Sequence, residues 1–151
     1  MADIVTNSKA RRDYHILETV EAGLVLRGTE VKSLRQGRAQ IADAFARVER
    51  DEVFLYNAHI DEYEQGNRFN HLPKAARKLL LNRREIRRLA EFAVLDKHVL
   101  VPLSFYWKNG RVKVALAVGR SKQEYDKRDT IKQRESDREL RRATMIQVKG
   151  R

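Results

Sequence analysis

Alternating apolar and polar positions predict that most of the chain before about residue 120 forms short β-strands. Residues 14–20 alternate, with Tyr14, Ile16 and Val20 on one side of an extended strand. A second apolar run, residues 24–26, lies between two glycines, so the pattern favours a hairpin-like start. Residues 44–49 and 53–59 are two more strand-like runs, and the polar residues between them predict another antiparallel pair.

The strongest local signal is the pair Asn109 and Gly110, which is typical of a type I′ turn. Residues 99–107 precede it, and apolar side chains at a spacing of two occupy residues 112–118 after it. This pattern predicts a long hairpin. Because Pro102 has no backbone N–H to donate, it belongs at an edge or a bulge of the first strand.

Two short helices interrupt the strands. Thr29 is a candidate N-cap for one helix that Gly37 ends, and Asn82 is a good N-cap for the other. The inward stripes are Val31 and Leu34 in the first helix, and Ile86, Leu89, Ala90 and Ala93 in the second. The outward residues are Glu30, Lys32 and Arg35 in the first helix, and Arg84, Arg87, Arg88 and Glu91 in the second.

Residues 61–73 are polar and predict a long loop, which is often functional. Lys78 begins a further short strand. Six or seven short strands with interposed helices in one small domain fit a closed or partly open β-barrel with helices packed outside it. An open α+β sheet is the competing architecture.

The pattern changes near residue 121. From there on the large aliphatic residues are Ile131, Leu140, Met145, Ile146 and Val148, which form no packing stripe. Such a segment buries too little surface to offset its ordering entropy. We therefore expect residues 1–120 to form one domain, and residues 121–151 to be a basic tail that is disordered alone and helical when docked on a partner.

Composition narrows the class of protein. The chain has 151 residues, 32 Lys and Arg against 21 Asp and Glu, a net charge of +11 and no Cys. The lack of Cys excludes disulfides, thiolate metal sites and thiol nucleophiles, and it is compatible with a cytoplasmic location. The sequence contains neither an apolar run long enough for a membrane span nor a signal-peptide pattern. A charge excess of this size favours a polyanionic partner such as nucleic acid, with a merely solvated basic surface as the alternative.

The positive charge is clustered. Residues 68–88 contain eight Lys or Arg and one acidic residue, and residues 120–151 contain eleven and six. The density of Arg77, Lys78, Arg83 and Arg84 indicates phosphate contacts. Phe69, in the polar loop, and Tyr125, in the tail, are candidates for stacking on a base. The other aromatics are expected in or near the core, and they are Tyr14, Phe45, Phe54, Tyr56, Phe105 and Trp107.

Catalytic chemistry has no support in the sequence. The four histidines, His15, His59, His71 and His98, are scattered without the spacing of a metal site. No serine lies in a glycine-flanked nucleophile elbow. Most carboxylates alternate with Lys or Arg, which favours solvated ion pairs over acid–base pairs. We therefore expect no catalytic residues, no metal and no cofactor.

Several segments together resemble one family. They are residues 21–26, 28–35, 67–71, 77–85, 106–110 and 125–128, in order and at matching spacing from Asn7 to the tail. The chain thereby resembles the small protein B family, the bacterial tmRNA-binding proteins of trans-translation. The resemblance implies an oligonucleotide-binding-type (OB-fold-like) antiparallel β-barrel with about three peripheral helices. It also implies a monomer that binds the tRNA-like domain of tmRNA and escorts it to ribosomes stalled on messages lacking a stop codon.

The resemblance adds site residues to those chosen for their charge. Asn7, Glu30, Leu80 and Lys113 match the family's RNA-binding surface, where Glu30 and Leu80 would shape the surface rather than bind phosphate. The expected RNA-binding set is Asn7, Lys9, Glu30, Lys32, Arg35, Arg68, Phe69, Asn70, His71, Arg77, Lys78, Leu80, Arg83, Arg84 and Lys113. The tail residues expected in the vacant message channel of the ribosome, near the decoding centre, are Lys122, Tyr125, Asp126, Lys127, Arg128, Lys132, Arg134, Arg138, Arg141 and Arg142.

Two alternatives stay open from the sequence. A basic barrel could also host an RNA-processing enzyme, which prolonged incubation with structured RNA would reveal by cleavage. A ribosomal protein is the nearer alternative, and it would stay on ribosomes at all times.

Overall fold

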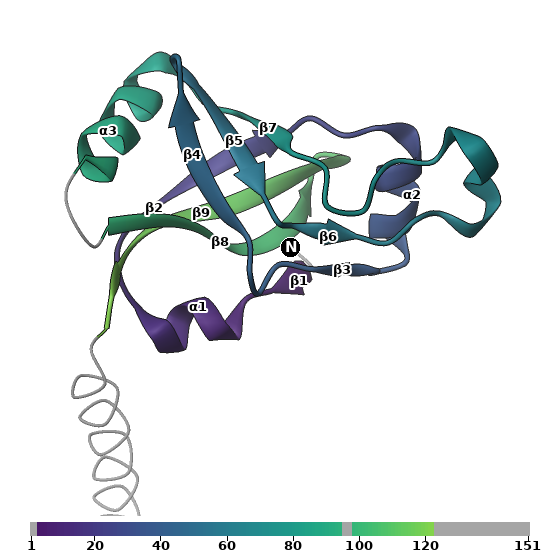
Figure 1. Ribbon diagram of the computed structural model, residues 1–151, viewed down its shortest axis with the longest axis horizontal. Coiled ribbons are helices and arrows are strands. Elements are labelled where there is room, and N and C mark those ends of the chain that lie inside the picture. Colours follow the sequence, from purple (N-terminus) through teal and green to yellow (C-terminus); the bar gives the residue numbers. More distant parts are fainter. Residues whose placement is uncertain (1–2, 95–97, 123–151) are drawn as a thin grey trace, which may run out of the picture. The chain divides into compact units, whose positions relative to one another are not determined.

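The computed structural model describes residues 3–94 and 98–122 (Figure 1). The secondary structure elements are β1 (Asp3–Thr6), α1 (Ser8–Asp13), β2 (Tyr14–Leu24), α2 (Gly28–Arg35), β3 (Ala39–Gln40), β4 (Phe45–Glu49), β5 (Glu52–Tyr56), β6 (His59–Ile60), η1 (Glu64–Phe69, a 3₁₀ helix), β7 (Arg77–Leu80), α3 (Arg83–Ala93), β8 (His98–Lys108) and β9 (Arg111–Ser121). The predicted tail falls almost entirely outside the described residues.

Within the described residues the fold is mainly β, with three α-helices around one large antiparallel sheet. Seven strands pair in the order β1-β8-β4-β5-β7-β2-β9, and β8 also pairs with β9. These pairings form a closed ring of six strands in the order β8, β4, β5, β7, β2 and β9. Between β4 and β8 the ring is closed by a single residue pair, Ala46 and Leu100. β3 and β6 form a separate two-stranded ladder. The mainly antiparallel prediction is confirmed, whereas the OB-type barrel stays a prediction.

The predicted long hairpin is confirmed. Asn109 and Gly110 have φ angles of 53° and 74°, as a type I′ turn requires. β8 and β9 pair along their lengths, and the register shifts between Pro102 and Ser104, so the proline lies at a bulge as expected. β4 and β5 form the other predicted antiparallel pair, joined by Arg50 and Asp51.

The N-terminal half differs from the predictions in two ways. β2 is one strand of 11 residues, because β9 pairs with it from Tyr14 to Gly23 and leaves no hairpin near residue 20. The structure also contains two elements that were not predicted, strand β1, which pairs with β8, and the short helix α1. Both elements are too short to show a periodic pattern of hydrophobic and polar residues, so they could not be recognised from the sequence. Their positions are set by contacts with distant parts of the chain.

Helix α2 begins two residues earlier than predicted. Its N-cap is Arg27, whose backbone N–H donates to Glu30 Oε1 at 2.8 Å, whereas the Thr29 hydroxyl bonds to His71. Gly37 follows the helix with φ of 70° and donates its N–H to the Leu34 carbonyl, as predicted. The expectation that Glu30 faces outward is wrong, because this side chain is buried.

Helix α3 closely follows its prediction. The Asn82 side chain accepts from Glu85 N at 2.8 Å, and the Glu85 carboxylate accepts from Asn82 N, which forms a capping box. Leu89 is buried in the core. The inward stripe contains Phe92 in place of Ala93, since Phe92 packs against the core and Ala93 is exposed.

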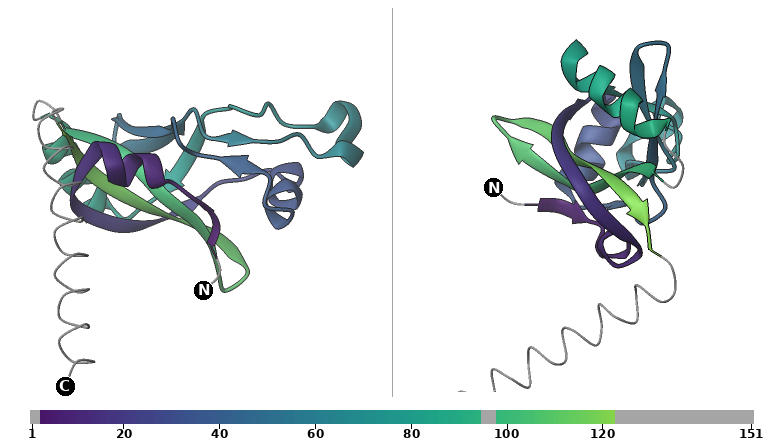
Figure 2. Two further views of the ribbon diagram at one scale, coloured as in Figure 1. Left: turned by 90° about the horizontal axis from the view of Figure 1, so that it is seen from below. Right: turned by 90° about the vertical axis from the view of Figure 1, so that its left-hand side faces the viewer.

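The main core lies between the inward faces of the paired strands. Its fully buried members include Leu34, Leu55, Leu79, Phe105 and Leu116. Figure 1 shows α3 beside the β4–β5 hairpin, whereas α2 and the loop containing η1 lie at the opposite end of the domain. The left view of Figure 2 shows α2 and this loop together at one end. Within residues 3–94 and 98–122, no helix is long and apolar enough to span a membrane.

Candidate nucleic-acid interface

Two neighbouring hollows lie where the end of β2 runs into α2. The first, which we call the hairpin hollow, has a volume of about 230 Å³ and is lined by residues including Leu80, Trp107, Arg111 and Lys113. The second, which we call the loop hollow, has a volume of about 310 Å³. Its lining includes Val25, Arg27, Glu30, Asn70, His71, Leu72, Arg77 and Lys78. Leu26 lines both hollows, so they adjoin.

A buried ion pair forms the base of the loop hollow. Arg77 Nε donates to Glu30 Oε2, and the two side chains are only 2% and 5% exposed. The Arg77 guanidinium also donates to the carbonyls of Ala58 at 2.7 Å and Pro73 at 2.9 Å. Burial of two charges requires such complete pairing. The pair therefore joins α2 to β7 and to the loop after β5. Because the Arg77 side chain is only 2% exposed, it is not accessible to a phosphate group at the surface.

His71 and Asn70 hold the same loop in place. His71 is buried, with Nε2 donating to the Ile60 carbonyl at 2.9 Å and Nδ1 accepting from the Thr29 hydroxyl at 2.9 Å. Asn70 accepts from Tyr63 N at 3.0 Å and donates to the Tyr63 carbonyl. These polar groups are satisfied inside the protein, so their role in this structure is to shape the loop hollow.

The rim of the hollows combines cations with exposed apolar side chains. Leu80 is 53% exposed, Leu72 is 74% exposed and Val25 is 49% exposed. Arg27, Lys78, Arg111 and Lys113 contribute the positive charge of the rim. Cations can neutralise phosphates, and apolar surface can pack against ribose or base faces. The arrangement is therefore suited to RNA.

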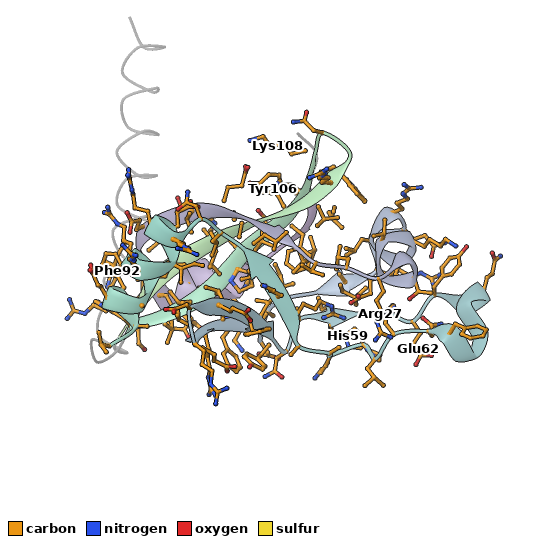
Figure 3. The ribbon with its side chains drawn as sticks, turned by 90° about the horizontal axis from the view of Figure 1, so that it is seen from above. Arg27, His59, Glu62, Phe92, Tyr106 and Lys108 are labelled. Carbon is orange, nitrogen blue, oxygen red and sulfur yellow. The ribbon has the colours of Figure 1, made fainter. Side chains whose placement is uncertain are left out.

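A carboxylate beside the hairpin hollow neutralises one nearby cation. Tyr106 Oη donates to Glu21 Oε2 at 2.5 Å, and Lys108 Nζ lies 3.1 Å from Glu21 Oε1. Figure 3 shows Tyr106 and Lys108 on the β8–β9 hairpin. These contacts hold the pKa of Glu21 below its usual value, whereas burial and the bond to Glu21 raise the pKa of Tyr106 to about 12. Glu21 thus stays ionised and paired with Lys108. The positive charge of Lys113 also helps to lower the pKa of Glu21. Among the described residues, however, neither Arg111 nor Lys113 lies within ion-pair distance of a carboxylate.

The structure brings together seven of the expected RNA-binding residues and disperses the others. Those at the hollows are Glu30, Asn70, His71, Arg77, Lys78, Leu80 and Lys113. Lys32 and Arg35 lie on the exposed face of α2, where Lys32 Nζ is 5.3 Å from the Tyr63 ring centroid. Phe69 is 75% exposed in η1, whereas the side chain of Arg68 lies outside the described structure.

The remaining expected residues lie away from the hollows. Lys9 pairs with Asp43 at 2.9 Å, and Arg83 and Arg84 begin α3. Asn7, His71 and Arg77 are buried, so the expectation of direct RNA contact is revised for these three residues. Glu30 is buried as well, and its expected role in shaping the surface stays a prediction. Of the tail set, only Lys122 is described. The expectations for Tyr125, Asp126, Lys127, Arg128 and the later tail residues lie outside the described residues.

We expect Asn7→Ala to lower stability without changing RNA affinity. Asn7 accepts from Ala10 N at 3.0 Å and donates to the carbonyls of Ile41 at 3.0 Å and Pro102 at 2.9 Å. Loss of this cap and two buried bonds should cost about 2–3 kcal/mol of unfolding free energy, measured by chemical denaturation. Ser8→Ala, an exposed change in the same helix, is the control. Weaker RNA binding at unchanged stability would instead place Asn7 in contact with RNA.

The sequence analysis missed several residues of this surface. Arg27 and Arg111 lie outside the basic run at residues 68–88, and Trp107 was expected only in or near the core, although it also lines the hairpin hollow. A signal was available for Arg111, because the turn at Asn109 and Gly110 places the next residue at the tip of the hairpin. Among the described residues, no group of three or more His, Cys, Asp or Glu could hold a metal ion.

Comparison with known proteins identifies the family. The family model described as SmpB protein matches residues 4–146. The SsrA-binding protein of Geobacillus thermodenitrificans is 56% identical over 140 residues, which cover 93% of this chain and 90% of the relative. That of Bacillus subtilis is 50% identical over 144 residues, covering 95% of this chain and 92% of the relative. A solved structure described as "tmRNA-SmpB: a journey to the center of the bacterial ribosome" has a TM-score of 0.70 at 43% identity, covering 86% of this chain and 95% of that one. The chain therefore belongs to the SmpB family.

Proposed function

We propose that the protein is a non-catalytic adaptor of trans-translation. It binds the tRNA-like domain of tmRNA and brings it to ribosomes stalled on messages lacking a stop codon, in the cytoplasm. The relatives are named for SsrA binding, and the structural neighbour is described with tmRNA and the ribosome. Membership of the SmpB family over residues 4–146 supports the same role for this chain.

The RNA-binding part of the proposed function rests on the pair of adjoining hollows. Arg27 caps α2, Lys78 lies on β7, and Arg111 and Lys113 lie on β9. The cations thus come from three separate segments and line the same two hollows as exposed Leu80. A rigid set of cations beside apolar surface reads the shape of a folded RNA rather than its sequence. The closed ring of strand pairings supports an OB-type barrel as the scaffold of this surface.

The second part of the proposed function, engagement of the ribosome, is assigned to the tail. Residues 123–151 would enter the vacant message channel and become helical there, with Asp126, Lys127 and Arg128 near the decoding centre. Such coupled folding suits a basic segment without an apolar stripe. The tail and the hollows are then separable functions of one chain.

Removing the tail tests this division. β9 pairs Arg120 and Ser121 with His15 and Tyr14, so the cut belongs after Lys122 rather than at the domain boundary expected at residue 120. We expect the shortened chain to fold and to bind the tRNA-like domain with a logarithmic salt slope of about −4, as for about five phosphate contacts. Tagging of stalled peptides should be lost.

Full-length protein is the control, and it should show the same RNA affinity and salt slope while supporting tagging. A slope near zero for both proteins would reject binding led by phosphate contacts. Retained tagging by the shortened chain would reject the role of the tail.

A further inference from the structure

Three aromatic side chains lie on the outward face of β4 and β5, which Figure 1 shows beside β7. Phe45 belongs to β4, and Phe54 and Tyr56 belong to β5. Side chains alternate between the two faces of a strand, and the neighbouring residues Ala46 and Leu55 are buried in the main core. The three rings therefore lie on the outside of the sheet, where they are half-buried. We call them the aromatic platform.

Contacts within the protein hold the rings of the platform in place. Phe45 and Tyr56 lie opposite each other on the two strands, and their rings stack with centroids 5.6 Å apart and planes inclined by 23°. Arg47 Cζ lies 5.2 Å from the Phe45 centroid and 5.9 Å from the Tyr56 centroid. Tyr56 Oη donates to Glu49 Oε1 at 2.6 Å, and this bond raises the pKa of Tyr56. A ligand of the platform would therefore meet rings that are already ordered, which lowers the entropy cost of binding.

The platform is continuous with the loop hollow. Phe54 lies between Arg47 of β4 and Lys78 of β7, which are its partners in the two strand pairings. The same row continues to Val25, whose backbone N–H donates to the Lys78 carbonyl at 3.0 Å. Lys78 and Val25 both line the loop hollow. An RNA held at that hollow therefore lies next to the platform, with only these two residues between them.

The charges around the platform select a base rather than a phosphate. Two cations, Arg47 and Lys78, are balanced by two carboxylates, since Glu49 accepts from Tyr56 and Glu52 lies 3.4 Å from Lys78. Such a balanced set does not attract a phosphate backbone. Aromatic rings stack on the face of an unpaired base whatever the net charge. We propose that the aromatic platform stacks one unpaired base of the RNA that the two hollows hold, an inference that rests on the proposed function.

The first test is a full-length variant with Phe54→Leu and Tyr56→Leu, which keeps apolar side chains but removes two rings. Its affinity for the isolated tRNA-like domain should fall by about tenfold or more, as for the loss of one stacked base. The logarithmic salt slope should stay that of the parent protein, because no phosphate contact is lost. The matched control exchanges the rings, with Phe54→Tyr and Tyr56→Phe, and should bind within about twofold of the parent. Urea denaturation identifies conditions under which both variants are folded.

The second test changes the RNA and leaves the protein intact. Each unpaired position of the tRNA-like domain is made abasic in turn, and binding to the parent protein is measured. At one position, removal of the base should weaken binding by about tenfold. The leucine variant should bind that abasic RNA and the intact RNA with equal affinity, because the stacking contact is already lost from the protein.

Equal RNA affinities for the leucine variant and the ring-exchange control would overturn the proposal and leave the platform to a protein partner. A changed salt slope in the leucine variant would also overturn it, because the loss would then lie in phosphate contacts. The same holds if no single abasic position weakens binding to the parent protein. Failure of the parent protein to bind the tRNA-like domain is a separate result, which would reject the proposed function itself.

Discussion

Glu30→Gln is expected to lower the free energy of unfolding by about 3–5 kcal/mol, because it leaves the buried Arg77 guanidinium without its counter-charge. Both side chains are almost completely shielded from water. Arg77 cannot turn outward, since the carbonyls of Ala58 and Pro73 hold its other donors. Urea denaturation of the full-length variant gives this free energy directly.

The control is Glu52→Gln, which removes the carboxylate of an exposed pair. Glu52 lies 3.4 Å from Lys78 Nζ, and the two side chains are 48% and 44% exposed. Solvent screens such pairs, so this change should cost less than about 1 kcal/mol. Equal losses for the two variants would contradict the role of Glu30 as a buried counter-charge.

The same variant should bind RNA more weakly under conditions where it is still folded. The Glu30–Arg77 pair joins α2 to the loop that carries His71 and Leu72, and both residues line the loop hollow. Once the pair is broken, these segments lose their fixed separation. Such a result would show that an acidic residue can belong to an RNA-binding surface without touching phosphate, as the sequence analysis expects of Glu30.

Local chemistry explains which elements could be predicted. Asn109 and Gly110 specify their turn through positive φ angles, and Asn82 caps α3 with the nearby Glu85. Each signal lies within a few residues of the element that it determines. Predictions for β8, β9 and α3 were therefore confirmed with small changes at their ends.

Burial of polar residues could not be predicted, because it depends on partners far along the chain. Glu30 and Arg77 are 47 residues apart, and Asn7 bonds across 34 and 95 residues. Glu30 follows a helical pattern that places it outward, and only packing of α2 against the later loop reverses this. The dense basic run at residues 68–88 is likewise divided by the fold into a buried Arg77, the rim residue Lys78 and the arginines of α3, which line neither of the two hollows.

The triple variant Arg27→Gln, Arg111→Gln and Lys113→Gln is expected to weaken binding of the tRNA-like domain on the order of 100-fold near physiological salt. Arg27 is remote in sequence from Arg111 and Lys113, but all three line the two adjoining hollows. Each lost phosphate contact should also make the logarithmic salt slope about 0.9 less steep. Titration of labelled RNA at several salt concentrations measures both quantities.

The charge-matched control is the triple change Arg11→Gln, Arg12→Gln and Arg87→Gln, which removes the same net charge at exposed positions away from the hollows. Long-range attraction to RNA depends on total charge and should fall equally in the two variants. Direct phosphate contacts should be lost only from the triple variant at Arg27, Arg111 and Lys113. Its salt slope should therefore change, whereas the slope of the control should stay that of the parent protein. Indistinguishable slopes for the two variants would mean that the hollows attract RNA only through the overall charge of the protein, and the interface would then have to be sought on another face.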